Sequence, residues 1–101
     1  MTKVCVDING KNCRLTMEGH ATGNELVCAA ASSIVFALSG YLLNAGSHVK
    51  KLRRNQLESG SAVISCTGDE CVAAAFRMAG IGLAQIAQQY PDHIFVAYLD
   101  N

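Results

Sequence analysis

The most constraining feature of the sequence is an Asn9-Gly10 pair between two runs of alternating apolar and polar residues. A period of two is typical of a β-strand with one buried face. An Asn-Gly pair favours a two-residue turn because both of its positions accept positive φ. The chain therefore opens with a predicted β-hairpin that ends near Gly19-His20. Its alternating apolar residues are Val4, Val6 and Ile8 before the turn and Cys13, Leu15 and Met17 after it.

A long helical pattern follows the short polar loop 21–24. Asn24 is one candidate cap for this helix, and Thr22 with Glu25 three residues later fits a capping box. In either case the helix begins just before Cys28, and Gly46 is expected to end it. Residues at three- and four-residue spacing predict the helix: Leu26, Ala29, Ala30, Ser33, Ile34, Ala37, Leu38 and Tyr41.

The second half of the chain predicts two or three strands and another helix. Residues 48–58 are strongly polar and are interpreted as an edge strand, and residues 62–66 form a more apolar strand after a Ser-Gly-Ser turn. Asp69 is the predicted N-cap of the second helix, and Pro91 prevents that helix from continuing. A final apolar strand is expected at 94–99.

The predicted order is ββαβ(β)αβ. Hairpins mixed with helices indicate an α+β fold, with one small mixed or antiparallel β-sheet that carries two α-helices. The length of 101 residues suits a single domain over 1–101. Both helices are apolar over wide faces, and this predicts a homodimer.

Composition argues against two classes of partner. The formal net charge is zero, from eight basic and eight acidic side chains, so a nucleic-acid-binding function is not expected. The local basic cluster, residues 50–54, is interpreted as a solvated face. We expect no membrane-spanning segment, because Ser and Gly interrupt the longest apolar stretch, and the N-terminus lacks a signal-peptide layout. The expected location is the cytoplasm.

The chain has five cysteines, an odd number that argues against a disulfide framework. Cys5, Cys13 and Cys66 lie in strand patterns and are expected to pack as small apolar side chains. Cys71 begins the second helix beside two acidic residues and is interpreted as structural. His48 and His93 are expected on solvated loops.

Cys28 differs from the other cysteines because it lies near the start of a helix and shortly after a histidine. The helix dipole and the first backbone N–H groups favour a thiolate at this place. His20, at the end of the opening hairpin, is close enough along the chain to reach the thiol and to act as its general base. The sequence therefore indicates that Cys28 is a candidate nucleophile. The spacing between His20 and Cys28 permits contact between the two side chains but does not require it.

Two further residues are candidates for a supporting role. Glu25 lies about one helical turn before Cys28 and either orients His20 or complements the helix dipole; the second interpretation is the one we favour. Ser32, one turn after Cys28, either bonds locally or faces the site.

The motifs Gly19-His20-Ala21 and 26–32, Leu-Val-Cys-Ala-Ala-Ala-Ser, resemble those of the ribosomal-processing cysteine protease (Prp) family. The resemblance covers essentially the whole chain. It implies a small dimeric α+β domain from bacteria that removes an N-terminal extension from a large-subunit ribosomal protein, cutting after aromatic residues. By motif position Cys28 is the nucleophile, His20 is the base, and Ser32 matches the motif's serine. The loop between His20 and Cys28 is shorter than in the family, and Glu25 replaces the usual Asp.

The resemblance implies a thioester mechanism with no metal or organic cofactor, and a helix-start N–H group, such as that of Cys28 itself, would hold the oxyanion. Two alternatives remain open. One is a zinc site formed by Cys66, Cys71, His20 and Cys28, although its spacing departs from the usual patterns. The other is a ribosome-associated binding module of the same fold without catalysis.

Overall fold

A computed structural model describes residues 1–20 and 23–101. The elements follow the predicted order, with a short 3-10 helix added before the third strand. Their bounds are β1 Thr2–Asn9, β2 Asn12–Glu18, α1 Glu25–Asn44, η1 Gly46–His48, β3 Val49–Glu58, β4 Ser61–Gly68, α2 Glu70–Gln89 and β5 Ile94–Asp100.

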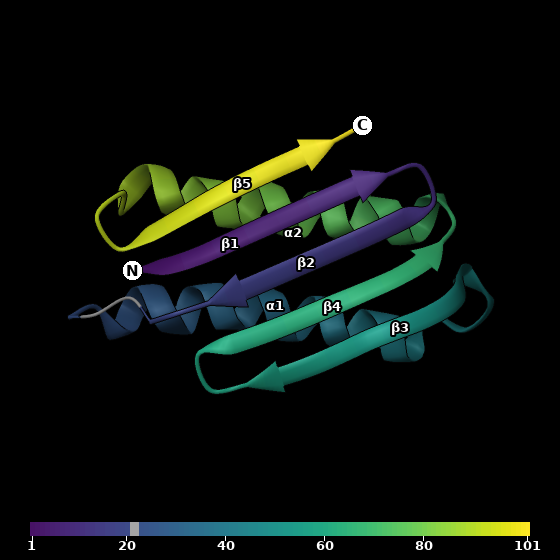
Figure 1. The fold of residues 1–101 in the computed structure, drawn as a ribbon, viewed down its shortest axis with the longest axis horizontal. Helices are drawn as coiled ribbons and strands as arrows, with labels where there is room; N and C mark the ends of the chain where they lie inside the picture. Colours follow the sequence, from purple (N-terminus) through teal and green to yellow (C-terminus); the bar gives the residue numbers. More distant parts are fainter. Residues whose placement is uncertain (21–22) are drawn as a thin grey trace.

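The strands form one five-stranded sheet in the order β3-β4-β2-β1-β5. The β1–β5 pair is parallel, and the other three pairs are antiparallel. Both helices lie side by side on one face of this sheet, with α2 behind β1 and β5 and α1 nearer β4 (Figure 1). The α+β prediction with a mixed sheet and two helices is therefore confirmed, as is the interpretation of β3 as an edge strand.

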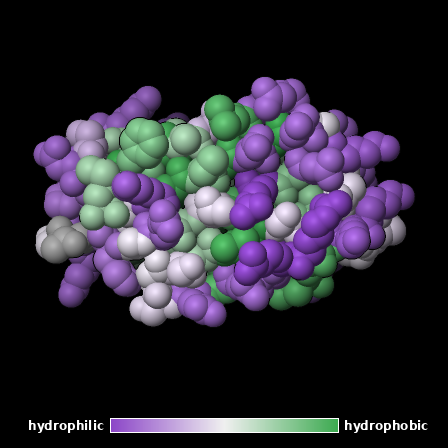
Figure 2. Space-filling model, in the orientation of Figure 1, coloured by the Kyte–Doolittle hydropathy of each residue, from purple (hydrophilic) through white to green (hydrophobic). Residues whose placement is uncertain are grey.

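The core lies between the sheet and the helix layer. Alternate strand residues such as Val6, Leu15 and Ile64 are fully buried, and Phe76 and Leu83 of α2 pack onto them. The opposite face of the sheet carries hydrophilic side chains with apolar ones between them (Figure 2). All the residues of the basic cluster 50–54 are exposed, as the sequence predicted.

The buried face of α1 differs from the predicted one. The sequence pattern placed Leu26 among the repeating apolar residues, but Leu26 is 68% exposed and its neighbour Val27 is only 1% exposed. The residues that α1 buries are Val27, Ala31, Val35, Leu38, Ser39 and Leu42. The helix is apolar on nearly every side, so periodicity alone did not distinguish the buried stripe from the exposed one.

The same apolar character affects a second expectation. By length and composition, α1 and α2 are each apolar enough to cross a bilayer, and in each helix 33% of the apolar stretch is buried inside the fold. The expectation that no segment meets this criterion was therefore too strict. Core helices of small domains also meet it, and both helices contribute buried residues to the core described above.

Candidate active site

His20 follows β2 directly, and the residue before it is held from two sides. Gly19 has φ +85° and donates its N–H to the carbonyl of Gly60 at 2.9 Å. Thr2 donates its hydroxyl to the carbonyl of Gly19 at 3.4 Å. A Cβ at Gly19 would lie 2.6 Å from the carbonyl oxygen of Met1, so no larger residue fits there without a shift of the backbone. The start of the histidine loop is thus fixed by β1 and by the β3–β4 turn.

The imidazole of His20 lies against that same turn. Gly60 has φ +74°, and a Cβ built there would lie 2.5 Å from Nε2 of His20. The side chain of His20 therefore uses the space that a glycine leaves empty. Sequence analysis identified residues 59–61 as a turn but did not connect them with the site, because only the pairing of β4 with β2 brings the turn to His20.

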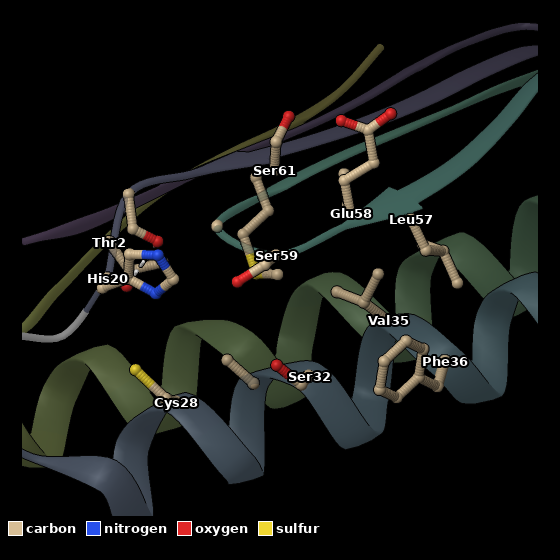
Figure 3. Close-up of a pocket in the computed structure, with 15 residues that line it drawn as sticks. Thr2, His20, Cys28, Ser32, Val35, Phe36, Leu57, Glu58, Ser59 and Ser61 are labelled. Atoms are coloured by element: carbon tan, nitrogen blue, oxygen red, sulfur yellow. Dashed lines mark hydrogen bonds between the residues drawn. The ribbon is translucent and has the colours of Figure 1, made fainter.

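Cys28 is the fourth residue of α1 and is half-buried. Asn24 caps the helix by accepting a hydrogen bond from the Val27 N–H at 3.1 Å, which confirms the first of the two capping alternatives. The other alternative involves Thr22, which lies outside the described residues. The Cys28 side chain points from α1 toward the ring of His20 (Figure 3).

The backbone N–H of Cys28 has a partner of its own. It donates to the carbonyl of Asn24 at 3.4 Å, as the first hydrogen bond of the helix. This group was the expected oxyanion donor, so that expectation does not hold in this arrangement. The N–H of Val27 is likewise taken by the cap, and Glu25 and Leu26 remain as the first-turn groups that precede the intrahelical bonds.

His20 and Cys28 line the same cavity, which has a volume of about 310 Å³. Ala31, Val35 and Phe36 of α1 give it an apolar wall. Val35 and Phe36 lie along α1 away from Cys28 (Figure 3). The opposite wall is the end of β3 and the turn into β4, with polar and small residues. The remaining lining residues are Thr2, Met17, Gly19, Ser32, Leu57, Glu58, Ser59, Gly60, Ser61 and Ala62.

The two supporting candidates are placed differently. Ser32 lines the cavity one turn after Cys28, whereas its neighbour Ser33 is exposed and donates its hydroxyl to the carbonyl of Ala29 at 2.8 Å. Glu25 is exposed in the first turn of α1 and is not among the described residues that line the cavity. This position agrees with the dipole interpretation of Glu25, in which a carboxylate stabilises the start of the helix.

The four residues of the zinc alternative are not brought together. Cys66 is fully buried in β4, opposite Cys13 of β2, and burial raises the pKa of the Cys66 thiol to about 11. Burial also raises the pKa of the Cys13 thiol. Both cysteines pack as apolar side chains, as expected. Cys71, which was interpreted as structural, is exposed at the start of α2 and does not pack in the core.

Solvated positions were expected for both His48 and His93. His48 is exposed, as expected, and its Nδ1 lies 2.7 Å from a carboxylate oxygen of Asp69. His93 is half-buried, and its carbonyl accepts a hydrogen bond from the N–H of Thr2 at 3.0 Å at the junction of β1 and β5.

A family model described as cysteine protease Prp matches residues 1–95. The class of protein defined by this match is a cysteine protease, in which a thiol attacks a peptide carbonyl. The chain belongs to the Prp family of cysteine proteases.

Solved structures show the same fold at low sequence identity. The essential ribosomal processing protease Prp from S. aureus with a covalently linked product peptide has a TM-score of 0.79 and 21% identity, over 97% of this chain and 99% of that one. Its complex with a substrate peptide has a TM-score of 0.74 and 19% identity, with the same coverage. SMU.848 from Streptococcus mutans has a TM-score of 0.72 and 18% identity, over 100% of this chain and 96% of that one. No curated protein matches the chain.

Proposed function

We propose that this chain is an endopeptidase that removes an N-terminal extension from a large-subunit ribosomal protein, with Cys28 as nucleophile and His20 as general base. The observation that carries the proposal is that a strand end and a helix start bring these two side chains to one cavity. The S. aureus relative, a ribosomal processing protease crystallised with a product peptide and with a substrate peptide, supports the choice of substrate.

The proposed reaction needs only groups of the protein and water. His20 takes the thiol proton, and the Cys28 sulfur attacks the peptide carbonyl carbon. Collapse of the tetrahedral intermediate breaks the C–N bond, and the imidazolium gives its proton to the leaving amine. His20 then removes a proton from water, which hydrolyses the thioester and releases the thiol. The N–H groups of Glu25 and Leu26 are the proposed oxyanion donors, since they precede the first intrahelical hydrogen bond.

The cavity also suggests how a peptide is held. Its apolar wall of Ala31, Val35 and Phe36 suits an apolar or aromatic side chain of the substrate, next to the scissile bond at Cys28. Gly60 and the serines on either side of it offer backbone and hydroxyl groups on the opposite wall. We therefore expect cleavage next to an aromatic residue, and Ser32 to contact the substrate from α1.

We also propose that the whole chain 1–101 acts as one domain in the bacterial cytoplasm, where its substrate is made, and that it forms a homodimer. Apolar residues exposed on the helix layer support the dimer. Leu26 and Leu43 of α1 are each 68% exposed, and Met78 of α2 is 74% exposed. Sedimentation should show a dimer at micromolar concentration, and a monomer throughout that range would contradict this part of the proposal.

The central experiment incubates the protein with a peptide that carries the ribosomal-protein extension. The wild type should cut once, and Cys28→Ser and His20→Ala should not cut. Cys5→Ser and His93→Ala are controls that remove the same side-chain types outside the cavity, and they should cut as the wild type does. Cleavage by Cys28→Ser would contradict the assignment of the nucleophile. Binding of the peptide without cleavage by the wild type would favour the non-catalytic binding module instead.

A further inference from the structure

A second group of reactive side chains lies at the opposite end of the sheet from the cavity. His48 ends η1, Asp69 immediately precedes α2, and Cys71 is the second residue of that helix. In Figure 1 these segments meet at the end of the sheet where β4 finishes. The end of β2 and the β3–β4 turn, which carry residues that line the cavity, lie at the opposite end. The proteolytic mechanism proposed above uses none of these three residues.

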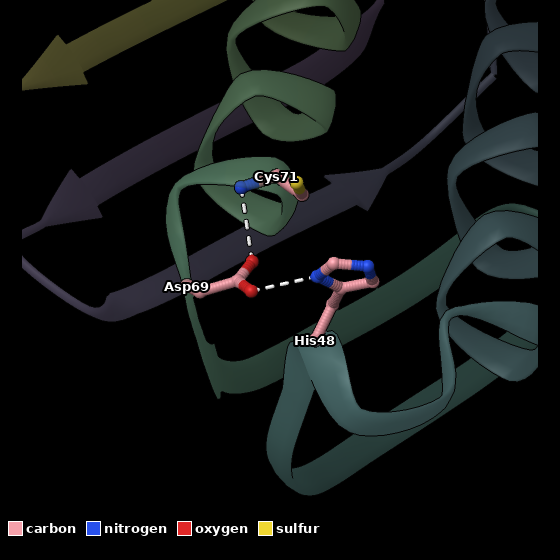
Figure 4. Close-up of side chains that lie close together, drawn as sticks. All are labelled: His48, Asp69 and Cys71. Carbon is pink, nitrogen blue, oxygen red and sulfur yellow. Dashed lines mark hydrogen bonds and ion pairs between the residues drawn. The ribbon is translucent and has the colours of Figure 1, made fainter.

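The three side chains converge on one small volume (Figure 4). One donor atom from each residue, an imidazole nitrogen, a carboxylate oxygen and a thiol sulfur, lies within 4.8 Å of the other two. Nδ1 of His48 is 2.7 Å from Oδ2 of Asp69. His48 and Asp69 are about half exposed, with side-chain exposed fractions of 48% and 43%, so an ion can reach the group from solvent.

The backbone beneath the group is fixed by several contacts. The N–H of Asp69 donates to the carbonyl of His48 at 3.0 Å. Oδ1 of Asp69 accepts from the N–H groups of Cys71 at 2.9 Å and Val72 at 3.4 Å. Gly68 allows this close approach, because a Cβ there would lie 2.9 Å from the carbonyl oxygen of His48. The segments that carry the three donors are therefore held together before any ligand arrives.

We propose that His48, Asp69 and Cys71 form a binding site for Zn²⁺. Imidazole nitrogen, thiolate sulfur and carboxylate oxygen are the usual zinc ligands, at about 2.0–2.3 Å from the metal. Tetrahedral coordination with such bonds separates ligand atoms by roughly 3.3–3.6 Å. Oδ2 and Nδ1 would move apart by less than about 1 Å to reach that spacing, and Oδ1 would keep its helix-capping bonds. Three protein ligands leave the fourth position to water.

The protons balance without any redox step. The Cys71 thiol loses its proton to solvent when sulfur binds the metal, because the thiolate is the ligand. The start of α2 favours this anion. Neutral His48 supplies the Nδ1 lone pair and carries its proton on Nε2 instead. Asp69 binds through the oxygen that it now directs at Nδ1, so the metal takes the place of the shared proton.

The test is a titration of the full chain with Zn²⁺ in competition with a chromophoric chelator. We expect one Zn²⁺ ion per chain in the wild type. The dissociation constant should be at least tenfold higher in His48→Ala and in Cys71→Ser. Asp69→Asn is the informative third variant, because an asparagine still caps α2 but lacks the charged oxygen. It should also weaken binding, with the helical circular dichroism signal unchanged. Substitution with Co²⁺ should give a thiolate-to-metal charge-transfer band that Cys71→Ser removes.

Two controls make the assignment specific. Cys5→Ser and His93→Ala should bind Zn²⁺ as the wild type does. If Cys28→Ser and His20→Ala lose the ion while His48→Ala and Cys71→Ser keep it, zinc binds in the cavity and the proposed site is wrong. Absence of competition with the chelator in the wild type would also overturn the proposal. Neither result depends on peptide cleavage, so the proposed protease function is tested separately.

Discussion

At the scale of single residues, the position of the His20 ring depends on a glycine that has no chemistry of its own. Gly60 leaves room for the imidazole, and its carbonyl accepts the N–H of Gly19, the residue before His20. A side chain at position 60 would meet the tip of the exposed His20 ring and not the packed backbone. The ring would therefore move, and the fold would not.

We predict that Gly60→Ala lowers kcat/KM for peptide cleavage by roughly 10²-fold, because a displacement of about 1 Å is enough to misplace a catalytic group. Gly10→Ala is the matched control. Gly10 also lies in a hairpin turn with positive φ, +62°, but a Cβ there would meet nothing within 4 Å. The free energy of unfolding should fall by a similar amount in both variants, about 1–2 kcal/mol, because each adds a side chain at a position with positive φ. Equal activity in the two variants would show that Gly60 does not position His20.

The neighbouring serines of α1 offer a second comparison of single residues. Ser32 lines the cavity, and Ser33 donates its hydroxyl to the carbonyl of Ala29 outside the cavity. We predict that Ser32→Ala lowers kcat/KM by about tenfold, the equivalent of about 1.4 kcal/mol in transition-state binding, and that Ser33→Ala has no effect. Steady-state peptide cleavage measures both. Similar values for the two variants would assign Ser32 a purely local role.

At the scale of elements, the strand alternation predicted the opening hairpin, and Asp69 was correctly predicted as the cap of α2. The turn of the hairpin was placed one residue too early, because Asn9 pairs with Asn12 at the end of β1 and the two turn residues are Gly10 and Lys11. The side chain of Asp69 accepts bonds from two N–H groups of that helix. The predicted buried face of α1 was wrong because the helix has apolar residues on every side. Which stripe is buried depends on where the helix crosses the sheet, and this is a tertiary property that local spacing does not contain.

The N-cap of α1 fixes the first turn of the helix and therefore the position of Cys28. We predict that Asn24→Ala lowers the free energy of unfolding by about 1 kcal/mol, because the Val27 N–H loses its cap. Fraying of this turn should also slow alkylation of Cys28. Asn44, at the other end of α1, donates to the carbonyl of Gly40 at 2.8 Å and is exposed, so Asn44→Ala is the control that should leave alkylation unchanged. Denaturant unfolding and mass spectrometry measure the two effects.

At the scale of the whole molecule, strand order decides which distant residues meet. The sequence offered His20 and Cys28 as a pair that the loop length permits, and the structure places both on one cavity. Nothing in the sequence indicated that residues 59–61 would complete that cavity, because β4 lies beside β2 only in the folded sheet. His48 and Cys71 were likewise unremarkable until η1 and α2 were seen to meet.

The sheet also determines how the fold responds to alkaline pH. Burial raises the pKa of Cys66 from 9.0 to about 11, and it raises the pKa of Cys13 on the facing strand. A thiol whose pKa is higher in the folded state binds its proton more tightly there, so its contribution to stability is complete below pH 9. That contribution is lost as the pH rises toward 11, because the unfolded chain then releases the proton first.

We therefore predict that the free energy of unfolding of the wild type falls between pH 9 and pH 11, and that it falls less steeply in Cys66→Ala. Some slope should remain in the variant, because desolvation also raises the pKa values of Tyr41 and Tyr98. Denaturant unfolding of both proteins at a series of pH values measures the difference. Parallel curves would mean that the Cys66 thiol reaches solvent in the folded state, which would contradict its place in the core between the sheet and the helices.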